Sequence, residues 1–216
     1  MPAQNVLRWQ DGLGWLVLSG GRMALSEVRA AAIERVTADG ALVCLSLGNP
    51  AAADALLDDM QELGASSGYL VDALAEDDET IVKRVGEAGL VVLSSDLPAR
   101  DAYSSLAGAV MEGVQVAYER GAVVLAEGGA AAAFGRYIVD DGQVTQGLGW
   151  LHDGALLADV ASAADSPQAQ TILSQVPEVV VVGVGVGSAL VLGGAGTVET
   201  WGKQQVTITL GRAYTE

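Results

Sequence analysis

The chain of 216 residues is poor in the side chains that most often carry catalysis or bind metals. It has one cysteine, Cys44, and one histidine, His152, and its 11 lysine and arginine residues face 27 aspartate and glutamate residues, for a formal net charge of −16. A single cysteine forms no internal disulfide, and nothing indicates an oxidising compartment. Transition-metal sites draw on histidine and cysteine, so we expect no metal. So acidic a surface repels phosphate backbones and anionic lipid headgroups, which argues against nucleic acid and membrane partners.

Long apolar runs are also absent. No segment approaches the roughly 18 consecutive apolar residues of a membrane-spanning helix. The first fifteen residues carry Arg8 and Asp11 in place of the apolar core of a signal peptide. We therefore expect a cytoplasmic protein. Apolar residues make up 50% of the chain, enough for a buried core, and the length fits one domain, 1–216.

Short apolar runs alternate with segments of helical periodicity through the first two thirds of the chain. The predicted strands are 15–19, 41–47, 68–71, 90–93 and 122–126. The predicted helices are 26–36, capped by Ser26, 50–63, 77–87 and 99–120. Strands that are apolar on both faces and separated by helices pair in parallel, with helices covering each side of the sheet.

The last third has a different pattern, with four closely spaced predicted strands at 178–184, 188–192, 197–201 and 206–210. Connections as short as these, such as Gly193-Gly194 and Gly202-Lys203, favour hairpins. The predicted fold class is therefore α/β, with a doubly wound, mainly parallel sheet flanked by helices and a C-terminal antiparallel β-meander.

Binding and catalytic sites in open α/β sheets lie at the carboxyl ends of the strands. The most informative of these ends is 122–137, AVVLAEGGAAAAFGRY, where an apolar strand turns into a helix of small residues. That pattern is typical of a nucleophile elbow, a strained turn that holds one side chain exposed above the sheet. Here the exposed position is Gly128, which has no side chain.

The order and spacing of several segments resemble the cyanophycinase and aspartyl dipeptidase (dipeptidase E)-like serine peptidases. These segments are the turn at 19–21, 54–64, 88–97, the elbow, 147–151 and 182–191. The resemblance implies a flavodoxin-like, class I glutamine-amidotransferase-like fold, and substrates that are aspartyl dipeptides or the aspartate–arginine polymer cyanophycin. It also implies a homodimer, for which Trp9, Trp150 and Trp201 are either interface residues or part of the core.

The resemblance places the family's catalytic positions on residues that cannot catalyse peptide hydrolysis. The family elbow Gly-Thr-Ser-Ala-Gly-Ala corresponds to residues 126–131, AEGGAA, so the serine nucleophile becomes Gly128. The oxyanion loop Gly-Gly-Asp-Gln corresponds to Ser94, Ser95, Asp96 and Leu97, and the histidine position falls at Val160. A triad works only as a unit. We therefore expect a catalytically inactive homologue that acts as a binding, scaffolding or regulatory protein. The alternative is an active hydrolase of Asp-containing peptides with an unrecognised site.

Four residues are candidates for binding a peptide or small molecule: Glu127, Gly128 and Gly129 of the elbow, and Asp96. Glu127 either accepts backbone amides or binds a cationic ligand, or it is only a cap or a solvent-facing carboxylate. Asp96 either lines a ligand cleft or, as is more usual, holds its own loop. His152 is interpreted as a surface residue beside Asp153 rather than a displaced catalytic base. No cofactor is expected.

Overall fold

The structure is a computed structural model that describes residues 6–47 and 49–214, so the ends of the predicted domain lie outside the described residues. Its main sheet contains β1 (Trp15–Gly20), β2 (Leu42–Ser46), β3 (Gly68–Asp72), β4 (Leu90–Ser95), β5 (Val123–Gly128), β10 (Ser188–Gly193) and β11 (Thr197–Gly202). From one edge to the other the order is β11-β10-β1-β5-β4-β2-β3. The five strands from β1 to β3 pair in parallel, and the β10–β11 hairpin joins β1 in antiparallel pairing.

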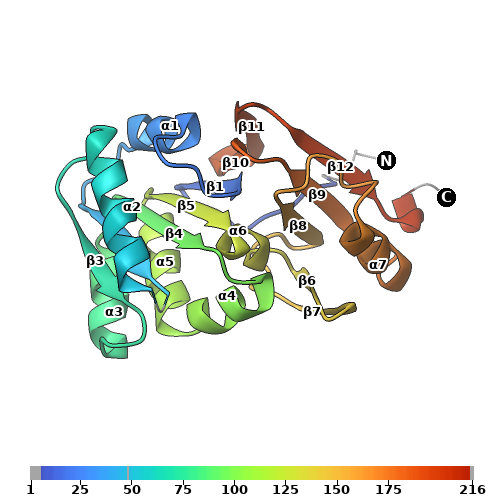
Figure 1. Ribbon diagram of the computed structural model, residues 1–216, viewed down its shortest axis with the longest axis horizontal. Coiled ribbons are helices and arrows are strands. Elements are labelled where there is room, and N and C mark those ends of the chain that lie inside the picture. Colours follow the sequence, from blue (N-terminus) through green and yellow to red (C-terminus); the bar gives the residue numbers. More distant parts are fainter. Residues whose placement is uncertain (1–5, 48, 215–216) are drawn as a thin grey trace.

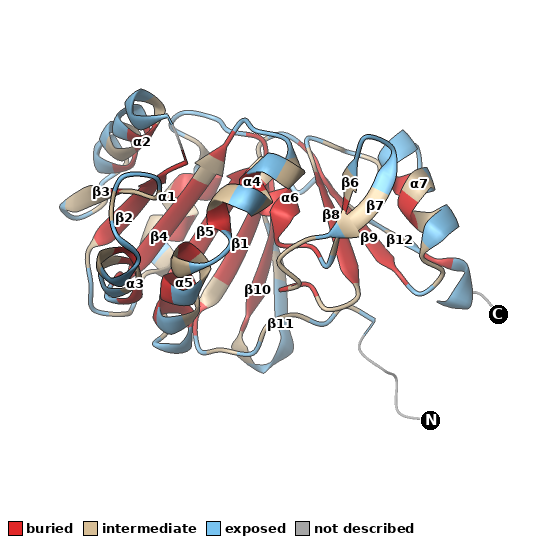
Figure 2. Ribbon diagram, turned by 90° about the horizontal axis from the view of Figure 1, so that it is seen from below, coloured by how far each residue is buried: buried red, intermediate tan, exposed pale blue. Residues whose placement is uncertain are grey.

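Helices cover both faces of this sheet, as Figures 1 and 2 show. One face carries α1 (Glu27–Arg35) and α2 (Pro50–Glu62), and the other carries α3 (Asp78–Gly86), α4 (Ala99–Leu106), α5 (Ala109–Glu119) and α6 (Gly129–Ala133). Successive residues of the buried strands divide between the two layers: Leu16 and Leu18 pack toward α5 and α6, and Val17 packs toward α1. The predicted doubly wound, mainly parallel sheet is confirmed.

The predicted Ser26 cap is confirmed, and the predicted helix over 77–87 also begins with a capping side chain. The Ser26 hydroxyl accepts a hydrogen bond from the Arg29 amide at 3.1 Å, and the Asp77 carboxylate accepts one from the Thr80 amide at 3.0 Å. Each bond satisfies one of the amides that a first helical turn leaves unpaired.

The single helix predicted over 99–120 is wrong, because the chain forms α4 and α5 with a break between them. The break lies at Ala107 and Gly108, and Gly108 has a φ of +98°, a conformation that favours glycine. Both helices bury one apolar face, so the helical periodicity continues across the break and conceals it.

A second sheet has the order β12-β9-β8, formed by β12 (Val206–Leu210), β9 (Val180–Val184) and β8 (Gly154–Ala158). Strand β9 pairs antiparallel with β12 and parallel with β8. The C-terminal strands are therefore antiparallel at β10–β11 and at β9–β12, but they do not form one continuous meander. The connections 185–187 and 203–205 are short, yet each carries the chain from one sheet to the other, so the hairpin predicted at Gly202-Lys203 does not form.

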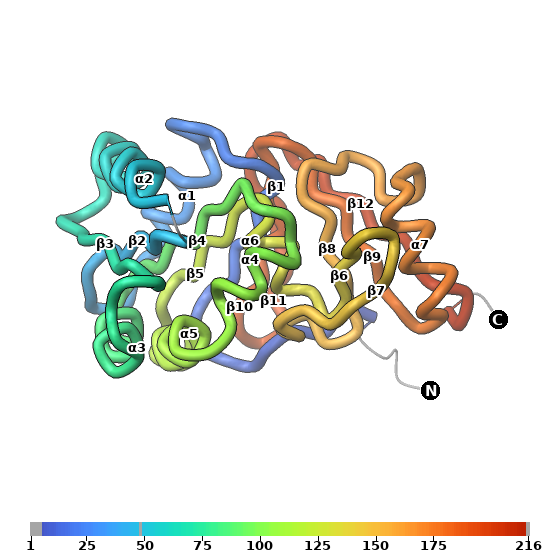
Figure 3. Tube along the Cα trace, turned by 60° about the horizontal axis from the view of Figure 1, so that its bottom comes forward, coloured from blue at the N-terminus to red at the C-terminus, as the bar shows by residue number. Residues whose placement is uncertain are grey.

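Besides β8, three helices and strands were not predicted: the hairpin of β6 (Tyr137–Asp140) and β7 (Gln143–Gln146), and α7 (Pro167–Gln175). Together with the second sheet they lie at the end of the molecule opposite α2 and α3 (Figure 3). Two 3-10 turns, Gly194–Gly196 and Arg212–Tyr214, complete the described elements. Within the described ranges, no helix is both long and apolar enough to cross a membrane.

The three tryptophans considered for an interface lie in different environments. Trp150 is 7% exposed and packs against the rings of Tyr118 and Phe134, with centroid distances of 5.1 and 5.2 Å. Trp9 and Trp201 are half-buried. Trp150 therefore belongs to the core.

Candidate functional site

The predicted elbow is present at the carboxyl end of the inner strand β5. Strand β5 lies between β1 and β4, ends at Gly128, and is followed at once by α6, which begins at Gly129. Gly128 has φ 61° and ψ −129°, a conformation that residues with a side chain rarely adopt. The sharp strand-to-helix turn at Gly128 is confirmed.

The loop that follows β4 packs directly onto this turn. A Cβ atom at Gly128 would lie 2.6 Å from the carbonyl oxygen of Ser95, and a Cβ atom at Gly129 would overlap the carbonyl oxygen of Leu97. No side chain therefore fits at either glycine while the loop keeps this position. The alanine that follows the serine in the elbow Gly-Thr-Ser-Ala-Gly-Ala would therefore not fit at Gly129.

A cavity of about 360 Å³ opens beside the elbow. Its size falls within the usual range for small-molecule sites. The charged side chains of its wall are Arg22, Asp96 and Asp159, and the apolar part of the wall comes from the loop after β4 and from α6, β6 and β8. Both glycines of the elbow line it as well.

The structure brings only some of the predicted residues to this cavity. Ser95 and Asp96 line it, whereas Ser94 lines a smaller cavity of about 140 Å³ beside α2. The Ser95 hydroxyl accepts a hydrogen bond from the Leu97 amide at 3.1 Å, which is the structural role of a turn hydroxyl. Asp96 is exposed and forms an ion pair with Arg22, and both residues line both cavities.

Within the segment that corresponds to the family histidine, Asp159 lines the cavity and Val160 does not. Asp159 follows β8 with a φ of 62°, and its carboxylate lies beside Gly21. Val160 is half-buried and packs with the apolar cluster under α7. Asp159 was missed as a site residue because β8 itself was not predicted, although an aspartate just after an apolar run was visible in the sequence.

His152 does not reach the elbow. It lines two other cavities, one with Arg8 and the other with Arg136, and it shares neither with Gly128. The interpretation of His152 as a loop residue beside Asp153 agrees with this placement.

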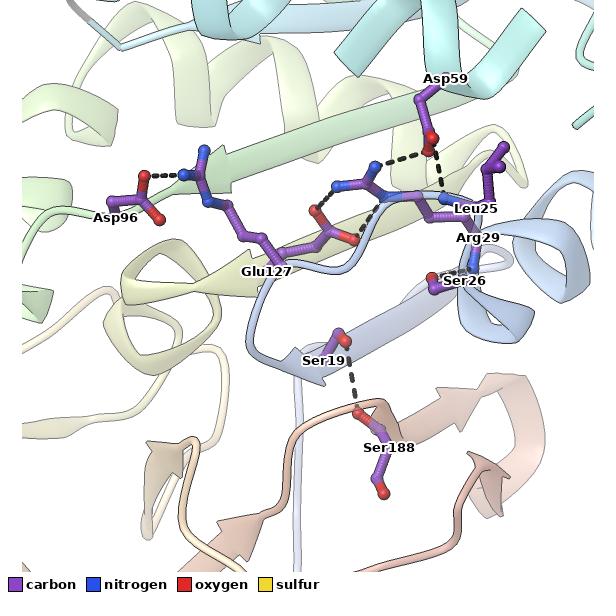
Figure 4. A network of polar contacts seen from close by, with 9 residues as sticks. Ser19, Leu25, Ser26, Arg29, Asp59, Asp96, Glu127 and Ser188 are labelled. Carbon is purple, nitrogen blue, oxygen red and sulfur yellow. Dashed lines mark hydrogen bonds and ion pairs between the residues drawn. The ribbon is translucent and has the colours of Figure 1, made fainter. Parts of the chain in front are cut away.

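Glu127 is part of a buried ionic network and does not line the cavity. Arg29 of α1 donates two hydrogen bonds to the Glu127 carboxylate, from Nε at 2.9 Å and from Nη2 at 2.6 Å, and a third from Nη1 to Asp59 of α2 at 2.6 Å. Figure 4 shows the Arg29 guanidinium between the two carboxylates. The side chains of Glu127, Arg29 and Asp59 are 1%, 6% and 10% exposed. Glu127 is thus neither a cap nor a solvent-facing carboxylate, and this network ties α1 and α2 to β5 directly before the elbow.

Burial and charge set the protonation of two groups in this region. Burial opposes the charge on Arg29, but the bonds to Glu127 and Asp59 outweigh it and raise the pKa of Arg29 above its usual value, so the guanidinium stays charged. Burial raises the pKa of the Cys44 thiol to about 12. The thiolate is the nucleophilic form of cysteine, so Cys44 is unreactive near neutral pH. In the part of the chain that the structure describes, no three His, Cys, Asp or Glu side chains are grouped to hold a metal.

Comparison with known proteins relates the fold, but not the sequence, to peptidases. No protein-family model matches the chain, and no curated protein matches it. A peptidase from an acI-B1 Actinobacterium is structurally similar, with a TM-score of 0.70 over 98% of each chain at 15% sequence identity. A putative peptidase E from Listeria monocytogenes EGD-e has a TM-score of 0.63 at 13% identity, over 88% of this chain and 99% of that one. The chain therefore has a peptidase-like α/β fold, shared with a peptidase E-type protein.

Proposed function

We propose that the protein is a catalytically inactive homologue of the cyanophycinase-like and dipeptidase E-like serine peptidases, and that it binds a short peptide or small molecule in the elbow cavity in a binding, scaffolding or regulatory role. The observation that carries the proposal is Gly128 at the nucleophile position of an otherwise well-formed elbow. A glycine offers no atom to attack a carbonyl carbon, and a triad without its nucleophile has no covalent step.

The loop above the elbow supports the same conclusion. An oxyanion hole needs N–H donors aimed at the developing negative charge. Here the carbonyl oxygens of Ser95 and Leu97 are the atoms closest to where side chains at Gly128 and Gly129 would begin. A carbonyl oxygen accepts a hydrogen bond and cannot donate one, so neither group can serve as an oxyanion-hole donor.

The charged side chains of the cavity favour a ligand that carries both a positive and a negative charge. The Arg22 guanidinium can bind a carboxylate, and Asp159 and Asp96 can bind an ammonium or guanidinium group. The remaining wall is mainly apolar. A short peptide that contains aspartate meets these requirements, and it is also the substrate class that the family resemblance implies.

Isothermal titration with an aspartyl dipeptide, followed by chromatography of the mixture, tests the proposal. We expect the dipeptide to bind and to remain intact, and we expect Arg22→Gln to weaken binding about tenfold through loss of a charge-assisted hydrogen bond. Arg100→Gln, which removes the same charge from an arginine on α4 outside the cavity lining, is the matched control and should bind normally. Hydrolysis by the unaltered protein that is abolished by Ser95→Ala would favour the active-hydrolase alternative.

The homodimer is proposed on the family resemblance. Its remaining support in the chain is the half-buried Trp9 and Trp201, since Trp150 belongs to the core. Light scattering should give twice the chain mass of 22.0 kDa, and a monomer mass at working concentrations would reject the dimer.

A further inference from the structure

One of the two cavities at His152, of about 330 Å³, is lined by Arg136, Gln146, Gly147, Gly149 and His152. It shares no lining residue with the elbow cavity. Its polar side chains are a guanidinium, an amide and an imidazole, each of which can donate a hydrogen bond. No aspartate or glutamate lines it, although the chain contains 27 of them.

The guanidinium of Arg136 is held in place at this cavity by three contacts. Its Nη1 donates a hydrogen bond to the carbonyl oxygen of His152 at 3.2 Å, and the group lies over the ring of Tyr137, 5.6 Å from its centroid. The third contact is an ion pair of 3.8 Å with Asp153. Only one of the five N–H donors is used in the hydrogen bond, so the fork of the guanidinium retains donors for a ligand.

The ion-paired groups at Arg136 are two arginines and one aspartate. Asp153 is the acidic group next to Arg136, but its carboxylate is already bound by Arg8, whose Nε donates at 3.0 Å. Two arginines thus face one carboxylate. In a chain of net charge −16 this is a local inversion of sign, and such a site attracts anions.

The backbone that lines the cavity is held by hydrogen bonds to neighbouring segments. The loop that carries Gly147, Gly149 and His152 is anchored by hydrogen bonds from the Gly147 amide to the Arg136 carbonyl at 2.9 Å and from the Leu148 amide to the Ala133 carbonyl at 2.8 Å. Gly149 has a φ of +76°, a conformation that suits glycine and lets the loop turn there. The backbone that positions Gly147, Gly149 and His152 therefore needs no reordering when a ligand binds, which reduces the entropy lost on binding.

We propose that this cavity is a binding site for a small oxyanion, a carboxylate or a phosphate group, held by Arg136, Gln146 and His152. The proposal is independent of the function proposed for the elbow cavity. Arg136 supplies the planar, bidentate donor pair that matches the geometry of carboxylate and phosphate oxygens, and His152 and Gln146 supply further donors.

The single histidine makes the test direct, because the ring of His152 gives the only histidine ring signals in the nuclear magnetic resonance spectrum. Sodium phosphate and sodium acetate are titrated separately at pH 7, and sodium chloride at matched ionic strength is the reference. We expect a saturable shift of the His152 signals with at least one oxyanion and none with chloride. The oxyanion that saturates identifies phosphate or carboxylate as the ligand group. A shift no larger than that caused by chloride would overturn the proposal.

Two substitutions with opposite expected effects complete the test. Arg136→Gln should weaken oxyanion binding about tenfold, whereas Arg100→Gln, which removes an arginine lying over Tyr103 outside the cavity, should leave it unchanged. Asp153→Asn should strengthen binding several-fold, because it removes the carboxylate that competes for Arg136. A gain in affinity does not arise from misfolding. Equal affinity in the Arg136→Gln and Arg100→Gln proteins would reject the assignment.

Discussion

Gly128→Ser is expected to destabilise the protein by about 2–5 kcal/mol and to produce no peptidase activity. The backbone conformation at Gly128, φ 61° and ψ −129°, costs a residue with a side chain about 1–3 kcal/mol. The new Cβ would also lie 2.6 Å from the Ser95 carbonyl oxygen, and backbone atoms move away only at further cost. Introducing the nucleophile therefore forces the loop after β4 off the elbow.

Activity should remain absent because the other parts of the catalytic unit are missing as well. A serine hydroxyl at position 128 would have no imidazole beside it, since His152 lines other cavities. Adding Val160→His does not supply a base, because Val160 does not line the elbow cavity. Loss of one triad member abolishes activity almost as fully as loss of all three, so restoring one member alone is expected to give no activity.

Gly142→Ser is the matched control for this substitution. Gly142 also has a positive φ, +75°, but a Cβ there meets no atom within 4 Å. Its cost is that of the backbone conformation alone, about 1–2 kcal/mol. Urea unfolding of both variants measures the difference, and an active-site-directed fluorophosphonate with an aspartyl dipeptide assay measures reactivity. Equal stability of the two variants, or labelling at position 128, would contradict the conclusion that the loop after β4 leaves no room for a side chain at Gly128.

The elbow could be predicted from the sequence because its determinants are local. A continuous apolar strand, 122–126, followed directly by small residues fixes both the strand and the turn, and β5 and α6 lie where that pattern placed them. The same is true of the helix starts at Ser26 and Asp77, where a side chain bonds to an amide three residues later. Interactions between residues that are close in the sequence can be predicted without knowledge of the fold.

The partners of the site residues could not be predicted in the same way. Glu127 and Arg29 are 98 residues apart in the chain, and no local pattern distinguishes a carboxylate that will meet a buried guanidinium from one that will face water. The C-terminal strands divide between two sheets according to the strands that β9 and β10 pair with. The sequence pattern of β9 and β10 does not determine those partners. Asp159 reaches the elbow cavity for the same reason, because β8 belongs to the second sheet.

The buried network of Glu127, Arg29 and Asp59 gives the second large expected effect. Bringing three charges out of water is costly, and their mutual attraction compensates only while all partners remain. The guanidinium is bonded on both sides, and Asp59 also accepts a hydrogen bond from the Leu25 amide at 2.7 Å. Removing the central cation leaves two carboxylates buried without a counter-charge. Arg84 and Glu76 on the surface form a pair at the same distance, 2.6 Å, but with side chains 36% and 22% exposed.

Arg29→Met is therefore expected to lower the free energy of unfolding by about 3–5 kcal/mol, while Arg84→Met costs about 1 kcal/mol or less because water solvates the released carboxylate. Adding Asp59→Asn and Glu127→Gln to Arg29→Met should recover part of the loss, because the two amides carry no charge to bury. A partial recovery would show that the loss in Arg29→Met comes from the unbalanced charges. Lost packing of the arginine side chain would not be recovered in this way, and methionine largely replaces that packing. Chemical denaturation of the four proteins provides the measurement. An Arg29→Met protein as stable as the Arg84→Met protein, or a triple variant less stable than Arg29→Met alone, would show that the ionic network does not hold α1 and α2 to the strand that leads into the elbow.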